Sequence, residues 1–154
     1  MEVRLEQRKP LRVAYVRHIG PYDQCCAAWE KVCGFAAQQG LFRADTMMIG
    51  IGHDNPDDTP AEKLRYDACV TVDDQFQPSG EIHVQELPSG EYAVLTLRGP
   101  YTGLAEAYRW LFGQWLPNSG RQMRPTPCYE VYVSDPSTTP PEQLITEICL
   151  PLMT

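Results

Sequence analysis

The sequence has little positive charge. Its 154 residues include 13 Lys and Arg against 20 Asp and Glu, which gives a formal net charge of −7. Proteins bind the phosphate backbone by displacing counterions with cationic side chains, so this balance argues against direct nucleic-acid binding. An acidic surface is compatible with a cationic small molecule, although the simpler interpretation is that the charge keeps the protein soluble.

Long hydrophobic runs are also missing. No apolar stretch approaches the roughly 18 residues that a membrane span requires, and the N-terminus lacks the charged segment and apolar core of a signal peptide. We therefore expect a soluble, unprocessed, cytoplasmic protein with no membrane partner. A hydrophobic fraction of 43% at this length is typical of one compact globular domain.

The sequence contains no recognisable metal site or catalytic triad. Its six cysteines form no C-x-x-C pair and have no histidine at zinc-ligand spacing, so we expect no metal and no cofactor. The three histidines are dispersed, which leaves no Ser-His-Asp or Cys-His arrangement. Every cysteine lies in an apolar run, so we expect all six to be buried and reduced. These residues are Cys25, Cys26, Cys33, Cys69, Cys128 and Cys149.

What the sequence does contain is an internal repeat. Gly-Pro-Tyr occurs at 20–22 and again at 99–101, each time between a strand-like run and a helix-like run. An offset of 79 residues aligns the start of the two copies, and beyond Gly34 the offset becomes 80, as if the second copy had gained one residue. At the second offset Pro56, Thr59, Pro60, Glu62, Leu64 and Cys69 recur as Pro136, Thr139, Pro140, Glu142, Leu144 and Cys149.

The repeat defines the domain organisation. The copies cover residues 1–72 and 81–152, and the polar, turn-rich segment 73–80 is predicted to be a linker. We therefore expect a single domain over 1–154 that is built from two equivalent modules.

Periodicity predicts the same elements in each copy. Alternating β-branched and aromatic residues indicate strands, and apolar residues at helical spacing follow each Gly-Pro-Tyr. Asp23 and Thr102 occupy the expected helix N-cap positions, and the glycine before each proline permits a sharp turn. The predicted strands are 11–19, 47–53, 65–72, 91–98, 127–133 and 145–152, with a further strand at the start of each copy.

These patterns predict an α+β fold. Each copy reads strand, strand, helix, strand, strand, and one copy alone would expose a sheet edge and much apolar surface. We therefore expect the two copies to pair about a pseudo-twofold axis into one antiparallel sheet with two main helices.

The copies differ most in the strand at 127–133. Side-chain alternation places Glu130 and Tyr132 on one face, where the first copy has Gly50 and Gly52. A carboxylate with aromatic neighbours suits an organic cation, and strand glycines often mark the close approach of a ligand. The alternative is that Glu130 is solvated on the open face of the sheet and that the glycines mark a bulge.

Aromatic residues near these strands are candidate pocket walls. Trp29 and Tyr108 are equivalent positions on the apolar stripes of the two helices, where core packing would also explain them. Tyr66, on the last strand of the first copy, is a further candidate. Trp110 lies off its stripe, so it is either an anchor for a ligand or partner or a partly covered surface residue.

With the duplication, the segments "HDNPDDTPAEKLRYDACVTV" and "PCYEVYV" resemble the GyrI-like small-molecule-binding family over essentially the whole chain. This family is similar to the effector-binding domains of multidrug-responsive and AraC-type regulators. In those domains a duplicated strand-helix-strand-strand (SHS2-type) module surrounds a ligand cleft that contains a glutamate. The resemblance assigns that glutamate to Glu130. The chain shows no helix-turn-helix segment, so it is not expected to be a complete regulator.

The resemblance implies three possible functions. One is a protein that binds or sequesters an amphipathic, cationic drug or toxin. Another is an inhibitor that contacts DNA gyrase and protects cells from gyrase poisons. The third is a hydrolase of cyclopropane-containing toxins with Glu130 as general base, which we rank below binding because no motif identifies a catalytic partner. The expected ligand-binding residues are Glu130, Tyr132, Tyr66, Trp29, Tyr108, Gly50 and Gly52.

Overall fold

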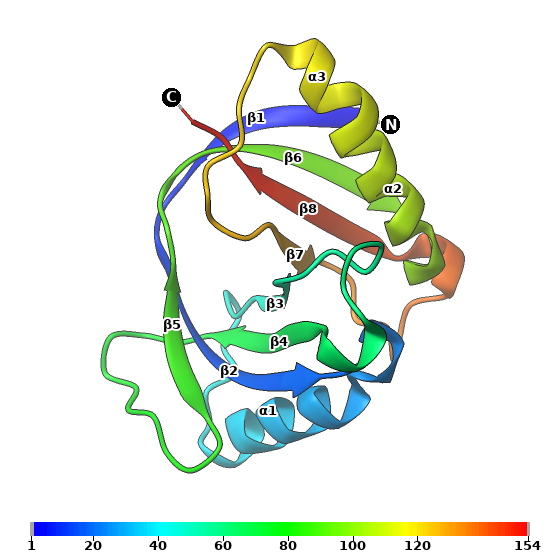
Figure 1. Ribbon diagram of the computed structural model, residues 1–154. Coiled ribbons are helices and arrows are strands. Elements are labelled where there is room, and N and C mark those ends of the chain that lie inside the picture. Colours follow the sequence, from blue (N-terminus) through cyan, green and yellow to red (C-terminus); the bar gives the residue numbers. More distant parts are fainter. Residues whose placement is uncertain (1, 154) are drawn as a thin grey trace. The chain divides into compact units, whose positions relative to one another are not determined.

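The computed structural model describes residues 2–153 and confirms the predicted α+β fold (Figure 1). The described chain forms two compact units. The amino-terminal unit is Lys9–Ser89, and the carboxyl-terminal unit combines residues 2–8 with 90–153. Each unit contains four antiparallel strands with a helical segment packed on one face.

In the amino-terminal unit the strands follow the order β5-β2-β4-β3, and every pairing is antiparallel. Helix α1 lies along β2 and β4, on one face of this sheet (Figure 1). The elements are β2 (Leu11–Ile19), η1 (Tyr22–Gln24), α1 (Cys26–Gln38), β3 (Met48–Gly52), η2 (Ala61–Lys63), β4 (Arg65–Thr71) and β5 (His83–Leu87).

In the carboxyl-terminal unit the order is β1-β6-β8-β7, again antiparallel throughout. The helical segment from α2 to α3 packs on one face of this sheet. The elements are β1 (Glu2–Arg8), β6 (Gly90–Arg98), η3 (Tyr101–Gly103), α2 (Leu104–Trp110), η4 (Leu111–Trp115), α3 (Leu116–Ser119), β7 (Tyr129–Tyr132), η5 (Pro141–Gln143) and β8 (Ile145–Pro151).

The first strand of each sequence copy is exchanged. β1 begins the first copy but pairs with β6 of the second, whereas β5 begins the second copy and pairs with β2 of the first. The compact units therefore do not coincide with the repeats at 1–72 and 81–152. Phe76, from the segment predicted as a linker, is also buried, and it packs in the core of the amino-terminal unit.

The two Gly-Pro-Tyr corners have the same geometry. Gly20 has a φ of 139° and Gly99 a φ of 129°, a region that side-chain-bearing residues rarely adopt. The Gly20 N–H donates to the Leu64 carbonyl and the Gly99 N–H to the Leu144 carbonyl, each at 2.8 Å. Because Leu64 and Leu144 are themselves equivalent in the repeat, these bonds tie the duplicated corners to duplicated loops.

This geometry predicts opposite effects for alanine at two glycines. Gly99→Ala should lower stability by about 1–3 kcal/mol, because the backbone there is unfavourable for any residue with a Cβ. Gly34→Ala should instead raise stability by about 0.5–1 kcal/mol, since this exposed position in α1 has no atom that would meet the new methyl group. Urea unfolding of both variants measures the two changes in stability. Equal changes would contradict the prediction that only Gly99 needs the backbone freedom of glycine.

Asp23 and Thr102 are not the helix N-caps that the sequence predicts. Both lie inside the 3₁₀ turns η1 and η3 that follow the prolines, and neither provides a side-chain cap. Helix α1 begins only at Cys26 and α2 only at Leu104. The sequence prediction failed because main-chain hydrogen bonds within the 3₁₀ turns replace a side-chain cap.

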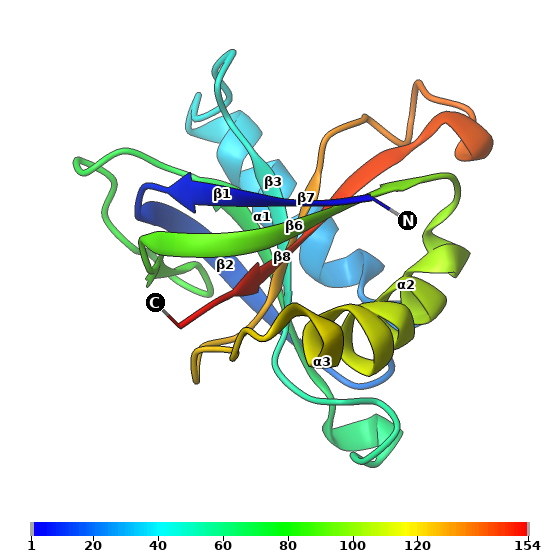
Figure 2. The same ribbon diagram turned by 90° about the horizontal axis from the view of Figure 1, so that it is seen from above.

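The extra residue of the second copy lies in a π turn. The helical segment runs without a break from α2 through the π-helical turn η4 to α3 (Figure 2). Such a turn is one residue wider than an α turn, which matches the change of offset at Gly34 and its counterpart Gly113. Within this turn Leu111 is buried, whereas Phe112, predicted on the buried stripe, is 39% exposed.

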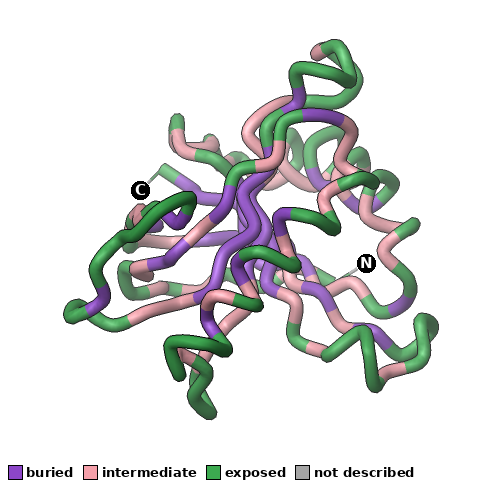
Figure 3. Tube along the Cα trace, turned by 90° about the horizontal axis from the view of Figure 1, so that it is seen from below, coloured by how far each residue is buried: buried purple, intermediate pink, exposed green. Residues whose placement is uncertain are grey.

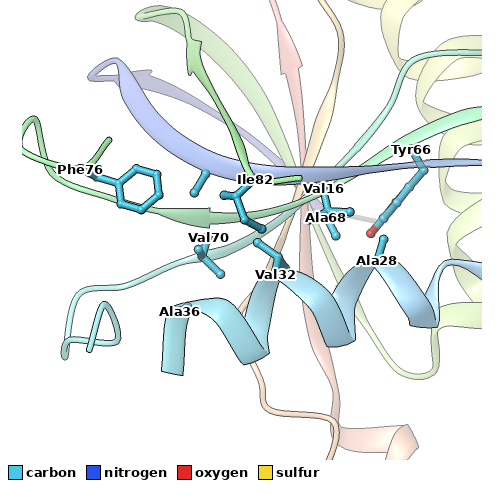
Figure 4. Close-up of a cluster of buried hydrophobic side chains, with 10 residues drawn as sticks. Val16, Ala28, Val32, Ala36, Tyr66, Ala68, Val70, Phe76 and Ile82 are labelled. Atoms are coloured by element: carbon cyan, nitrogen blue, oxygen red, sulfur yellow. The ribbon is translucent and has the colours of Figure 1, made fainter. Parts of the chain in front are cut away.

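Each unit buries an apolar core between its sheet and its helix, and buried positions follow the strands (Figure 3). In the amino-terminal unit Val32 and Ala36 of α1 belong to one cluster with Ala68 and Val70 of β4 (Figure 4). The corresponding cluster of the carboxyl-terminal unit is Ala93, Leu95, Ala107, Leu111, Cys128, Ile148, Leu150 and Leu152.

The cysteines are free thiols, but not all are buried. Cys69, Cys128 and Cys149 are buried as predicted, and burial raises the pKa of Cys149 to about 12. Cys26 is exposed, which corrects the prediction that all six are covered. It lies in the first turn of α1, while Cys25 and Cys33 are half-buried.

Candidate functional site

Glu130 is the centre of a hydrogen-bonded cluster in the carboxyl-terminal unit. It lies on β7 and is only 9% exposed. The Tyr108 hydroxyl, from α2, donates to Glu130 Oε2 at 2.7 Å, and the Tyr132 hydroxyl donates to Oε1 at 2.7 Å. Both carboxylate oxygens therefore accept a phenol hydrogen bond, and Tyr108 connects the helix to the strand. The alternative that Glu130 is solvated on an open sheet face is wrong.

Two further rings extend this cluster. The Tyr101 ring lies edge-on to Tyr132, with centroids 5.5 Å apart, and the Phe112 ring stacks on Tyr108 with centroids 6.3 Å apart. Phe112 is the most exposed of the four rings, whereas Tyr101, Tyr108 and Tyr132 are half-buried. The carboxylate is thus bordered by aromatic surface that reaches the outside of the unit.

Burial sets the electrostatics of the cluster. It raises the pKa of Glu130 above its ordinary value of 4.5, and the hydrogen bonds from Tyr108 and Tyr132 partly oppose that shift. Burial also raises the pKa of Tyr108 well above the usual range, with the nearby carboxylate as a second cause, so its hydroxyl remains a donor. Within residues 2–153 no lysine, arginine or histidine forms an ion pair with Glu130.

The structure groups Trp29 and Tyr66 in the amino-terminal unit. The Trp29 Nε1–H donates to the Tyr66 hydroxyl at 3.2 Å, and the two rings lie edge-on with centroids 6.4 Å apart. Tyr22 adds a third ring, 5.8 Å from Tyr66. Figure 4 shows Tyr66 extending toward α1 near Ala28, so these aromatics pack on the helix-facing side of the sheet.

The two strand glycines lie beside this group. Gly50 is buried and pairs with Ala68 in the sheet, while Gly52 pairs with Tyr66. A Cβ at Gly52 would lie 3.5 Å from the Tyr22 ring, which is ordinary van der Waals contact. The Tyr22 ring therefore does not by itself require glycine at position 52. Of the seven predicted site residues, Glu130, Tyr108 and Tyr132 lie together in one unit, and the other four lie in the second unit.

A second buried acid was missed by the sequence analysis. Asp67, on β4, has no exposed surface. Its carboxylate accepts two hydrogen bonds from Arg17, at 2.8 and 3.0 Å, and one from Gln85 at 2.9 Å, and it lies 2.7 Å from His53 Nε2. Burial alone would raise the pKa of Asp67, but these hydrogen bonds lower it to about 2.

Glu147 is the counterpart of Asp67 in the second copy. It pairs with Arg4 at 2.5 Å and with Arg8 at 3.2 Å, and these bonds overcome the effect of burial and lower its pKa. Both acids interrupt apolar strands at the same place in the repeat, which is a signal that the sequence offered. Both also have cationic partners, whereas Glu130 has none among the residues that the structure describes.

Trp110 is half-buried and packs against the core of the carboxyl-terminal unit, which favours the partly covered alternative. Over residues 2–153 no helix is both long and apolar enough to cross a membrane. In the same range, no three His, Cys, Asp or Glu side chains are grouped to hold a metal ion.

Comparison with known proteins assigns the chain to a family. The GyrI-like small molecule binding domain matches residues 1–153. The chain belongs to the GyrI-like small-molecule-binding family. Among its GyrI-like relatives, the DNA gyrase inhibitor of Escherichia coli is 30% identical over 139 residues, an alignment that covers 88% of this chain and 87% of the inhibitor.

Solved structures show the same fold. The EcmrR C-terminal domain matches this GyrI-like chain with a TM-score of 0.80 at 20% identity, over 99% of this chain and 98% of that domain. SAV2435, solved with bound tetraphenylphosphonium, matches with a TM-score of 0.62 at 20% identity, over 99% and 94% of the two chains. At these identities the likeness establishes the architecture of the GyrI-like domain.

Proposed function

We propose that this GyrI-like domain binds an organic cation at Glu130. The observation that carries the proposal is a buried carboxylate that accepts two phenol hydrogen bonds but has no cationic partner within residues 2–153. Burying a charge is costly unless it is paired. A cationic ligand would supply the pairing that Arg17 gives to Asp67 and Arg4 gives to Glu147.

The surroundings of Glu130 support a ligand that is apolar as well as charged. Aromatic faces attract cations through their quadrupoles. Tyr108 and Tyr132 contact the carboxylate, and Phe112 and Tyr101 pack against these two rings. The net charge of −7 favours the approach of a cation over that of an anion. SAV2435, which shares the fold, was solved with the organic cation tetraphenylphosphonium.

The same geometry favours binding over hydrolysis. A carboxylate is a better general base when its pKa is raised toward neutrality, and the two phenol hydrogen bonds to Glu130 oppose that rise. The raised pKa of Tyr108 keeps its hydroxyl protonated and donating. We therefore assign Glu130 the role of an electrostatic anchor.

The direct test compares a cation with a neutral compound of similar shape. Isothermal titration calorimetry with tetraphenylphosphonium should give a measurable Kd, and triphenylphosphine oxide should bind at least about tenfold more weakly, because pairing a buried charge is worth roughly 2–5 kcal/mol. Equal affinity for the two compounds, or no binding of the cation, would overturn the proposal.

Cation affinity should also depend on pH in a defined direction. The charge of tetraphenylphosphonium does not change with pH, so any dependence comes from the protein. Because the pKa of Glu130 is raised above 4.5, lowering the pH from 8 toward that raised value neutralises the carboxylate and should weaken binding progressively. Titrations across this range should show a slope in the wild type and none in Glu130→Gln. A slope that persists in the variant would assign the effect to another group.

A second function, inhibition of DNA gyrase by protein contact, is favoured by the relatives that carry this name at about 30% identity over most of both chains. The acidic charge of the chain would suit the basic surface of a DNA-binding enzyme. A supercoiling assay with purified gyrase tests this function, and absence of inhibition at micromolar protein would remove it. Because Glu130 is buried, Glu130→Gln should leave such inhibition unchanged.

A further inference from the structure

The sheet of the carboxyl-terminal unit contains a buried hydroxyl without a partner. Thr146, on β8, has no exposed surface, and within residues 2–153 its Oγ1 forms no hydrogen bond. Buried polar side-chain atoms nearly always have a partner in protein or in ordered water, because leaving one unpaired costs free energy. This hydroxyl therefore needs an explanation.

Strand register places Thr146 beside Glu130. Thr146 lies directly opposite Tyr132, and the next pair on the same face is Ile148 opposite Glu130. Directly opposite residues in an antiparallel pair point to the same side, and diagonal neighbours are roughly 7–8 Å apart. Ile148 belongs to the cluster that packs against α2, so all four side chains share the helix-facing side of the sheet.

The first copy has a different residue at the equivalent position. The counterpart of Thr146 is Tyr66, whose hydroxyl accepts the hydrogen bond from Trp29. The second copy thus has a shorter side chain with an unpaired hydroxyl where the first has a long side chain with a paired one. Packing alone gives no reason for this, since valine has the same shape without the cost of a buried unpaired hydroxyl.

We propose that Thr146 is a hydrogen-bonding contact for the ligand of the Glu130 site. The ligand class is then narrower than an organic cation, because the ligand also carries a hydroxyl, ether or carbonyl oxygen near its charged centre. Glu130 pairs with the charge, and the Thr146 hydroxyl pairs with the oxygen. This inference rests on the function proposed for Glu130.

Access to Thr146 requires a neighbouring side chain to move. Tyr132, directly opposite, is only half-buried, and its ring contacts the half-buried ring of Tyr101. Rotamer changes at binding surfaces are common even where the backbone stays fixed. A ligand that replaces the hydrogen bond of Tyr132 to Glu130 and displaces the Tyr132 side chain can therefore reach the neighbouring Thr146 hydroxyl.

Stability without added ligand gives the first test. Thr146→Val removes the unpaired hydroxyl and keeps the shape, so Tm should rise by about 2–4 °C. The matched control is Thr96→Val on β6, because the Thr96 hydroxyl accepts a hydrogen bond from Arg4 at 3.0 Å and its loss should lower Tm. A fall in Tm for Thr146→Val would mean that the hydroxyl already has an internal partner and would overturn the proposal.

Binding gives the second test, with tetraphenylphosphonium and the three positional isomers of (hydroxyphenyl)triphenylphosphonium as probes. At least one isomer should bind the wild type about two- to tenfold more tightly than the parent cation, the range expected for one neutral hydrogen bond. Thr146→Val should abolish that preference and leave the affinity for the parent cation unchanged.

The outcomes separate this inference from the proposed function. If no isomer is preferred, or if the preference survives in Thr146→Val, the role of Thr146 is overturned, while weaker binding of every probe by Glu130→Gln still supports the cation site. If no probe binds the wild type at all, both proposals fail.

Discussion

Replacing Glu130 by Gln should weaken tetraphenylphosphonium binding by roughly 2–5 kcal/mol, the usual cost of losing one partner of a buried charge pair. The substitution removes the negative charge, while the amide oxygen can still accept the hydrogen bond from Tyr108. The loss should therefore appear in affinity rather than in folding. Isothermal titration calorimetry measures it, with thermal unfolding of the same sample as the check on structure.

Glu106→Gln is the matched control. Glu106 lies exposed on α2 of the same unit, and its substitution changes the net charge by the same amount as Glu130→Gln. Its affinity for the cation should stay close to that of the wild type. The Tm of Glu130→Gln should be unchanged or higher, because a raised carboxyl pKa means that ionised Glu130 opposes folding at neutral pH. Full affinity in Glu130→Gln would exclude the anchor role, and a large loss in Glu106→Gln would point to long-range charge instead.

Asp67→Asn should destabilise the protein by about 3 kcal/mol, at the lower end of the cost of breaking a buried ion pair. The change leaves Arg17 and His53 without the carboxylate that they share. The cost is at the lower end because the Arg17 side chain is 37% exposed and can be partly hydrated. Urea unfolding at neutral pH measures the free energy of unfolding. As a control, Asp57→Asn at an exposed position should change that free energy by less than about 0.5 kcal/mol.

The pH dependence of this difference has a defined sign. The pKa of Asp67 is lowered from 3.8 to about 2, so its ionised form stabilises the folded state fully above pH 3.8 and loses that contribution as the pH falls through 2. The stability gap between wild type and Asp67→Asn should therefore be constant near neutrality and shrink below pH 4. A gap that stays constant down to pH 2 would show that the charge of Asp67 is not what stabilises the fold.

Much of the local architecture could be predicted from the sequence. Strand periodicity placed β2 at its observed bounds, and the repeated Gly-Pro-Tyr located both corners, because a positive φ at the glycine is a local backbone requirement. Alternation along β7 correctly put Glu130 and Tyr132 on one face. The change of offset in the repeat even marked the position of the π turn, since an inserted residue in a helix must be accommodated within a turn.

Which side chains contact one another depends on tertiary packing and could not be predicted. The exchange of β1 and β5 could not be predicted, because two copies with the same element order are compatible with either pairing. The phenol of Tyr108 on Glu130 and the cations on Asp67 join residues that are distant in the sequence. The unpaired hydroxyl of Thr146 is likewise a property of its neighbours. Periodicity fixes the face on which a side chain lies, but burial and hydrogen bonding depend on what packs against that face.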